Sequence, residues 1–354
     1  MKFLFIVSGT RNFPSSRVRV FQFLPYLQAH GLPFDVLNMR ADGVGNQGLY
    51  RRWARRSLRL IQLCWYVLRA DRYRVVFIQK YLPPVGLLFL LRYLNCNIIY
   101  DFDDAIFLLH QGQPRSGLRR LWHRVLQYRL SCVLRLSKQV IVSNDFLKEY
   151  AQAYNPQVVI LPSVVNTDLH SPQPREVSAD RPVVIGWIGT PLNSLYLKSL
   201  QKVFRALSEQ YGDRIMIELV GSGPIHFEGV NVVTRNWSLD EEVDRLRHFD
   251  IGIMPLPDDL WSRGKAGYKL LLYMAVGLSC VASPVGVNVH LIQEGYNGFL
   301  ARSDEEWIEK LGALVESPAL RQRLGTRGRD CVVHKYSTSV IAPQWIQLLQ
   351  STAG

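Results

Sequence analysis

The sequence has few cysteines, no long apolar run and no repeated segment, and each absence excludes a class of protein. Five cysteines are scattered over 354 residues and no two have CxxC spacing, so neither a zinc site nor a disulfide framework is indicated. No apolar run approaches the roughly 20 residues that span a bilayer. Residues 3–7 are apolar, but a polar turn follows at once. The apolar run is therefore too short for a signal peptide. We expect a soluble protein of a reducing compartment.

Acidic residues are also scarce over one part of the chain. Residues 40–140 hold 18 Lys and Arg but only five Asp, whereas the rest of the chain holds 24 residues of each sign. The formal net charge of +13 therefore arises from this stretch alone. Its composition is otherwise that of a globular protein, and at roughly 150 residues per domain the length predicts two domains.

Two probable helices carry much of this positive charge. In each, apolar residues recur at helical spacing and arginines lie mostly to the other side. Three interpretations are open: a solvated helix face, attraction to an anionic membrane surface, and nucleic-acid binding. We expect the membrane surface and no nucleic acid, because neither RNA-binding aromatics nor zinc-finger spacing is present. The apolar positions are Ala54, Leu58, Ile61, Trp65 and Leu68 in the first helix, and Leu118, Leu121, Trp122 and Val125 in the second.

The remaining chain alternates short apolar strands with amphipathic helices, for example a helix at 18–30, in two series separated by a polar, proline-containing segment at 171–181. Such alternation predicts doubly wound parallel sheets, here two Rossmann-like domains facing each other across a ligand cleft. The expected strands are 3–7, 34–37, 75–79, 98–100, 139–142 and 158–161 before the linker, and 183–188, 215–220, 230–233, 251–254, 279–282 and 299–301 after it.

One turn in the second series has the residues of a diphosphate clamp. Arg263, Gly264, Lys265 and Gly267 lie between a buried strand and an expected helix at 268–276. Glycines let the backbone approach a ligand, and a helix start attracts anions. Lys269 lies one turn beyond Lys265, so both lysines would share a helix face if the helix starts early enough. Gly277 is placed to cap the end of this helix.

Other strand ends in this series carry glycine or aromatic residues. Gly189-Thr190 and Gly221-Ser222-Gly223 each follow an apolar strand, and Arg235-Asn236-Trp237 follows the next one. Loops at the carboxyl ends of parallel strands meet at one edge of the sheet. We therefore expect these loops to converge on one nucleotide, with Trp237 placed either in the core or against a base.

The chain resembles, over nearly its whole length, the retaining glycosyltransferases of the GT-B fold, family 4. Stretches that carry the resemblance in the second half are Trp187-Ile188-Gly189, Arg235-Asn236-Trp237, Asp250-Ile251-Gly252-Ile253-Met254-Pro255-Leu256, Gly264-Lys265-Ala266-Gly267-Tyr268-Lys269-Leu270-Leu271, Ala282-Ser283-Pro284-Val285-Gly286-Val287-Asn288 and Asn297-Gly298-Phe299-Leu300. Those in the first half are Gly9, Ser16-Arg17-Val18-Arg19, Tyr100-Asp101-Phe102-Asp103-Asp104 and Val142-Ser143-Asn144.

The resemblance implies an acceptor domain at 1–170, a linker at 171–181, a donor domain at 182–336 and a C-terminal helix at 337–354 that crosses back. It implies transfer of a sugar, with retention, from a nucleoside-diphosphate sugar to a lipid-linked or saccharide acceptor in polysaccharide biosynthesis, at the cytoplasmic face of a membrane and without a metal or other cofactor. The implied catalytic residues are Asp103, Lys265 and Lys269, and the implied donor contacts are Gly9, Arg17, Gly189, Thr190, Gly221, Arg235, Asn236, Trp237, Arg263, Gly264, Gly267, Tyr268, Val285 and Gly286.

The sequence departs from the family pattern at four positions. Gly264 and Leu272 stand where many members have glutamates, and Thr190 and Leu195 stand where Arg and Lys are usual. The lysines and arginine of the clamp would replace the missing cations. Loss of the carboxylates leaves a second hypothesis, a nucleotide-sugar-binding protein of the same fold with weak or no turnover.

The acidic turn Asp101-Phe102-Asp103-Asp104 has three possible roles. It resembles the metal-binding DxD motif of the other glycosyltransferase fold, GT-A, and Mg²⁺ prefers oxygen ligands. It follows a strand near the place where related enzymes present a carboxylate to the cleft. It is also compatible with a structural turn or helix cap. We expect Asp103 to be a functional carboxylate.

Overall fold

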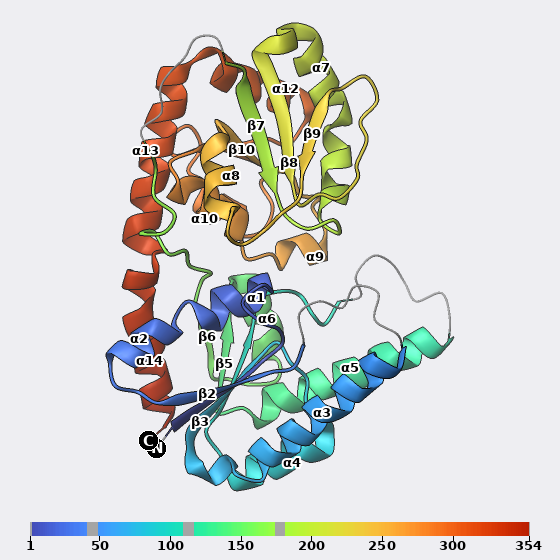
Figure 1. Ribbon diagram of the computed structural model, residues 1–354, viewed down its shortest axis with the longest axis vertical. Coiled ribbons are helices and arrows are strands. Elements are labelled where there is room, and N and C mark those ends of the chain that lie inside the picture. The colour runs from blue at the N-terminus through green and yellow to red at the C-terminus, as the bar shows by residue number, and fades with distance from the viewer. Residues whose placement is uncertain (1, 41–48, 109–116, 174–180, 354) are drawn as a thin grey trace. The chain divides into compact units, whose positions relative to one another are not determined.

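The computed structural model describes residues 2–40, 49–108, 117–173 and 181–353. It divides into two compact units, each with its own core (Figure 1). Unit 1 comprises Met1–Ser163, Gly264–Ala266 and Ile341–Gly354, and unit 2 comprises Val164–Arg263 and Gly267–Val340. Of the expected linker at 171–181, residues 174–180 lie outside the described residues.

Unit 1 is built on a six-stranded parallel sheet of order β2-β1-β3-β4-β5-β6. The inner strands form because they are short apolar runs that are buried on both faces, whereas the edge strands are partly exposed. The elements are β1 (Lys2–Val7), α1 (Pro14–Ser16), the π-helix η1 (Arg17–Phe21), α2 (Leu24–Ala29), β2 (Phe34–Asn38), α3 (Leu49–Val67), η2 (Ala70–Arg72), β3 (Tyr73–Gln79), α4 (Val85–Leu94), β4 (Ile98–Phe102), α5 (Gly117–Leu136), β5 (Gln139–Val142), α6 (Asp145–Gln152) and β6 (Val158–Ile160).

Helices cover both faces of this sheet. α4 packs against α3 and α5, and the three helices lie on one face (Figure 1). On the other face Trp345, from the last helix of the chain, stacks on Phe5 and Phe23 with ring centroids 5.6 and 4.9 Å apart. Trp345 is 1% exposed, so the C-terminal helix α14 (Thr338–Thr352) is part of the core of unit 1, as the prediction of a helix crossing back requires.

The prediction of a single helix at 18–30 is wrong. The chain turns helical earlier, at Pro14, passes through the π-turn η1 and starts again as α2. Pro25 lies in the first turn of α2, where its missing N–H costs nothing, whereas within a longer helix it would remove a hydrogen bond.

Unit 2 contains a second six-stranded parallel sheet, of order β12-β11-β10-β7-β8-β9. All the expected strands are present in both units; several have the expected ends, and the ends of the others are displaced by one or two residues. The elements are β7 (Val183–Ile188), η3 (Ser194–Leu200), α7 (Gln201–Tyr211), η4 (Gly212–Arg214), β8 (Ile215–Val220), β9 (Val232–Arg235), α8 (Glu242–His248), β10 (Ile251–Met254), α9 (Leu260–Arg263), α10 (Tyr268–Ala275), β11 (Ser279–Ala282), α11 (Asn288–Leu291), β12 (Phe299–Leu300), α12 (Asp304–Glu316) and α13 (Pro318–Lys335).

The chain leaves unit 1 at Ser163, earlier than the boundary expected at residue 170. Val165 forms an isolated parallel bridge with Ser337. The guanidinium of Arg329, on α13, donates to the carbonyls of Thr167 and His170 at 2.8 and 2.6 Å. These contacts hold residues 164–170 to unit 2.

Candidate functional site

The loops after β7, β8 and β9 meet at the carboxyl edge of the sheet of unit 2. A Cβ added to Gly221 would lie 2.3 Å from the carbonyl oxygen of Gly189 and 3.0 Å from the Cβ of Trp237. Gly221 also has φ +74° and its amide donates to the Arg235 carbonyl at 2.8 Å. No side chain fits between these loops. The backbone of two glycine turns and the Cβ of Trp237 therefore meet at one point, which agrees with the predicted convergence of these loops.

Lys269 belongs to the same cluster. Its Nζ lies 4.4 Å from the ring centroid of Trp187, and a Cβ on Gly189 would lie 3.1 Å from its Cε. Trp187 is completely buried, and the Lys269 side chain lies over its ring. This puts a cation beside the bare turn of Gly189. Sequence reasoning did not assign Trp187 to the site, although a tryptophan two residues before a strand-end glycine is a usable signal.

The start of α10 is set by Gly267, which adopts a left-handed conformation with φ +69°. A Cβ there would come within 2.5 Å of Leu291 and 2.7 Å of Val287. Because Gly267 reverses the backbone, Lys265 lies outside the helix. The helix starts at Tyr268 as predicted, so the early start that would put Lys265 and Lys269 on one helix face is not met. The far end follows the prediction, since α10 ends where Gly277, with φ +77°, closes the last turn.

The other residues of the clamp are divided between the two units. Gly264 and Lys265 belong to unit 1, whereas Arg263 and Lys269 belong to unit 2. The exposed Arg263 pairs with Asp258, its Nε lying 2.8 Å from Oδ1. The structure therefore brings Lys269, but not the Arg263 guanidinium, to the cluster around Gly189.

The segment after β9 is held by a buried carboxylate. Trp237 Nε1 donates to Glu242 Oε2 at 2.9 Å, and Glu242 is 4% exposed. The other oxygen, Oε1, lies 3.6 Å from Nε2 of the buried His170. His170 Nδ1 contacts the carbonyl of Asn166 at 3.0 Å and must carry a proton to donate to it. The indole N–H thus points toward a buried carboxylate, and the Trp237 side chain packs against the core of unit 2.

Neighbouring residues of the same loop are more exposed. Arg235 Nε lies 3.9 Å from Oε1 of the fully buried Glu218, whose other oxygen contacts His248 at 2.9 Å. Asn236 and Thr190 are exposed. The amides of Asn193 and Ser194 donate to the Thr190 carbonyl, which closes the turn after β7.

A cavity of about 550 Å³ opens in unit 2, at the carboxyl ends of β10 and β11. Its lining includes Leu195, Asp258 and Val285. Ser283 also lines the cavity, and its Oγ accepts from the amide of Leu256 at 3.0 Å, which links the two loops. The volume is within the range of small-molecule sites.

Several residues that were predicted to contact the donor take part in the packing of unit 2. Val285 is 5% exposed and belongs to the core, against which Tyr268 is packed. A Cβ on Gly286 would lie 2.9 Å from the carbonyl oxygen of Arg263, so the two loops touch through backbone. Leu272 is 3% exposed in the same core, where a carboxylate would be buried.

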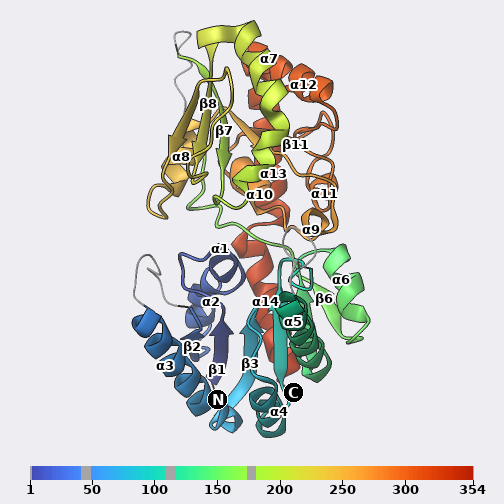
Figure 2. The same ribbon diagram turned by 90° about the vertical axis from the view of Figure 1, so that its right-hand side faces the viewer.

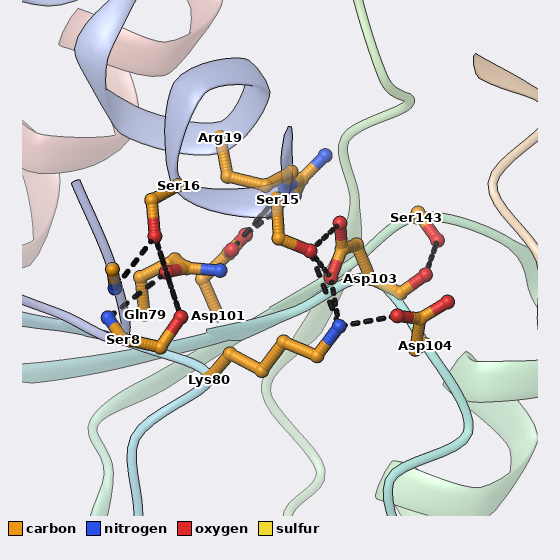
Figure 3. Close-up of polar contacts among 11 residues, drawn as sticks. Ser8, Ser15, Ser16, Arg19, Gln79, Lys80, Asp101, Asp103, Asp104 and Ser143 are labelled. Carbon is orange, nitrogen blue, oxygen red and sulfur yellow. Dashed lines mark hydrogen bonds and ion pairs between the residues drawn. The ribbon is translucent and has the colours of Figure 1, made fainter. Parts of the chain in front are cut away.

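A second polar cluster lies at the carboxyl edge of the sheet of unit 1 (Figure 3). Ser15 Oγ donates to both carboxylate oxygens of Asp103 at 2.5 and 2.6 Å, and Lys80 Nζ lies 3.2 Å from Oδ1. Lys80 also pairs with Asp104. Burial lowers the pKa of Lys80, but the two aspartates outweigh burial and hold it above its ordinary value.

Lys80 is the one residue other than glycine with a positive φ, +53°, in the described part of the chain. Such strain persists only where the surroundings enforce it, and it is concentrated at functional sites. Sequence reasoning missed Lys80 and Ser15. The usable signal was a lysine directly after a buried strand.

Asp101 has a structural partner. Arg19 donates to its carboxylate from Nε at 3.0 Å and to the carbonyl of Leu161 from NH1 at 2.6 Å, and both charged residues are buried. Burial raises the pKa of Asp101 and Arg19 lowers it, with a net rise. The three aspartates of the DxD-like turn are thus paired with cations of the chain. In the described ranges no group of three or more His, Cys, Asp or Glu is placed to hold a metal ion.

The predicted contacts of the first strand end are also placed here. A Cβ on Gly9 would lie 2.5 Å from Cβ of Phe13, and the Gly9 amide donates to Ser16 Oγ at 3.0 Å. Arg17 is half-buried and its NH1 lies 3.5 Å from the carbonyl of Arg11. Among the helices that the structure describes, none is long and apolar enough to cross a membrane.

Comparison with known proteins gives a consistent picture. Residues 182–317 match the family model described as glycosyl transferases group 1. No curated protein matches the chain. Similar solved structures are sucrose-phosphate synthase from Thermosynechococcus elongatus (14% identity, 99% of each chain, TM-score 0.69), a glycosyltransferase from Rickettsia africae (13%, 99% of this chain and 98% of that chain, 0.67) and HepE from Anabaena in complex with UDP and glucose (15%, 99% and 100%, 0.66). The chain has the GT-B fold, and its second unit carries the sequence features of group 1 glycosyl transferases.

Proposed function

We propose that this protein is a retaining glycosyltransferase of the family 4 type that binds a nucleoside-diphosphate sugar on unit 2. The observation that carries the proposal is the convergence of Gly189, Gly221, Trp237 and Lys269 at one sheet edge. Glycine turns let a ligand approach the backbone closely, Lys269 supplies positive charge, and Trp237 supplies a ring for a base. The family model spans all four residues.

The chemistry that this arrangement supports is stabilisation of the leaving diphosphate. The negative charge that develops as the glycosidic bond breaks would be met by Lys269 and by the first amides of α10. In the family that the chain resembles, the departing phosphate helps to remove the proton of the acceptor hydroxyl on the same face, so no protein nucleophile is needed. Lys265 remains a candidate second cation for the diphosphate.

Unit 1 would take the acceptor, a lipid-linked or free saccharide. Asp103 is the candidate contact for an acceptor or sugar hydroxyl, and Ser15 and Lys80 fix its carboxylate. The cluster of Lys80, Asp103 and Asp104 carries one more negative than positive charge, which suits neutral hydroxyls better than a phosphate. We place the enzyme at the cytoplasmic face of a membrane, where a lipid-linked acceptor would lie.

The test is calorimetric titration of the protein with UDP and GDP, followed by UDP-glucose, which HepE binds in its crystal structure. A charge-assisted contact contributes about 1.5–3 kcal/mol. Lys269→Ala should therefore weaken nucleotide binding by about tenfold to a hundredfold. Lys335→Ala, which removes an exposed lysine of α13, should bind as the parent does. Equal affinity of Lys269→Ala and the parent would reject the assignment of the site.

A binding protein without turnover is the second candidate function. The observation that favours it is Leu272, which occupies a core position where related enzymes have a glutamate. Nucleotide release from a panel of nucleotide sugars, with and without saccharide acceptors, separates the two. Saturable binding of a donor with no release of nucleotide above the uncatalysed rate would favour the binding protein.

A further inference from the structure

The first basic helix exposes its apolar stripe instead of burying it. Leu58, Ile61 and Trp65 of α3 and Leu68, directly after its last residue, are 55%, 64%, 49% and 65% exposed, and they recur at spacings of three and four residues. They therefore lie on one face of the helix. The core contacts of α3 are made from a different side, by residues such as Leu63, which is completely buried.

The second basic helix repeats this arrangement. Leu121, Trp122, Val125 and Tyr128 of α5 are all exposed, and the first buried residue after them is Leu130. Both helices belong to the layer that covers one face of the sheet of unit 1, and the N-terminal half of each extends beyond the strands (Figure 1, Figure 2). We call the exposed apolar residues of α3 and α5 the arginine–aromatic surface.

Charge accompanies the apolar residues of this surface. Neither α3 nor α5 contains an aspartate or glutamate. Arg55 and Arg56 are exposed on α3, and Arg120 and Arg124 are exposed on α5. Arg69 covers the Trp65 ring, with its guanidinium carbon 3.9 Å from the ring centroid. Exposed tryptophans, aliphatic side chains and unopposed arginines on one helix are the composition of helices that lie in a membrane interface.

The positive charge of the two helices also decides which partner the arginine–aromatic surface can bind. A second copy of the chain would bring two acid-free arginine helices together, and like charges across an interface are repelled. A nucleic acid would meet the arginines but would leave Leu58, Ile61 and Leu121 in water. An anionic bilayer satisfies both features, because its headgroups pair with arginine and its acyl region accepts the apolar stripe.

We propose that the arginine–aromatic surface inserts into the headgroup–acyl boundary of an anionic membrane. The inference goes beyond Coulombic attraction to a membrane, because it assigns part of the binding to buried apolar side chains. It does not depend on the proposed transferase activity. Each inserted large apolar side chain should raise vesicle affinity by about tenfold, and each arginine near the surface by about fivefold.

The experiment is flotation with phosphatidylcholine vesicles that contain or lack phosphatidylglycerol, at low and high salt. The parent should float with anionic vesicles, and high salt should leave a bound fraction, since salt screens charge but not burial. Ile61→Asn combined with Leu121→Asn should lower affinity by about a hundredfold and remove the salt-resistant fraction. Leu169→Asn is the matched control, because Leu169 is 58% exposed in unit 2, and it should float as the parent does.

A second readout reports insertion directly. Vesicles with brominated acyl chains should quench tryptophan fluorescence of the parent, and the quenching should fall in Trp65→Phe combined with Trp122→Phe. The inference is overturned if the parent fails to float with anionic vesicles, if high salt releases all of it, or if the double asparagine variant abolishes a concentration-dependent dimer seen without lipid. Nucleotide affinity should be the same in all these variants, which separates failure of insertion from failure of the donor site.

Discussion

The contact between the loops after β7 and β8 makes a sharp prediction for Gly221→Ala. An alanine Cβ there would lie 2.3 Å from the carbonyl oxygen of Gly189, so the two loops must separate by about 1 Å to restore an ordinary contact. The backbone φ of +74° adds about 1 kcal/mol for a residue with a Cβ. Overpacking adds about 1–3 kcal/mol. We expect Gly221→Ala to lower the free energy of unfolding by about 2–4 kcal/mol and to weaken nucleotide binding at least tenfold.

Gly295→Ala is the matched control for the part of the loss of unfolding free energy that comes from the positive φ. Gly295 has φ +68° in the same unit, but nothing lies within 4 Å of an added Cβ. The free energy of unfolding of this variant should fall by only about 1 kcal/mol, and its nucleotide affinity should be unchanged. Urea denaturation measures the stabilities, and calorimetric titration with UDP and GDP measures the affinities. If Gly221→Ala folds and binds nucleotide as well as Gly295→Ala does, the two loops do not form the donor site.

Two further predictions concern buried charges. Because folding raises the pKa of Lys80, its ion pairs stabilise the protein fully below the ordinary lysine pKa of about 10.4 and lose this contribution as the pH rises above it. Lys80→Met should therefore flatten the fall in unfolding free energy between neutral and strongly alkaline pH; an unchanged alkaline slope would contradict this. Glu242→Gln should leave the fold intact but loosen Trp237, with a changed near-ultraviolet circular dichroism signal and about tenfold weaker nucleotide binding, whereas an unchanged spectrum and affinity would show that Glu242 does not position the ring.

Much of the unit 2 site is predictable because its residues sit at strand ends. A buried parallel strand is a short apolar run, so the end of the run locates the edge of the sheet. Gly189, Gly221 and Trp237 follow such runs directly, and the structure brings them together. Local glycine geometry is less predictable. The start of α10 at Tyr268 was predicted, but the left-handed turn at Gly267 that sets it is required by packing against Leu291, which no spacing rule anticipates.

The positions of the strands along the chain, the two parallel sheets and the end of α10 at Gly277 were predicted from the sequence alone, because each depends on local apolar runs or on one glycine. The pairing of charges was decided only in three dimensions. Arg19 meets Asp101 from 82 residues away, and Lys80 meets Asp103 from the neighbouring strand, because adjacent strands bring distant segments to one edge. Periodicity likewise defined an apolar stripe on α3. Whether that stripe would be covered depended on which face of α3 packs against the rest of unit 1, and only the tertiary structure shows that the stripe is exposed.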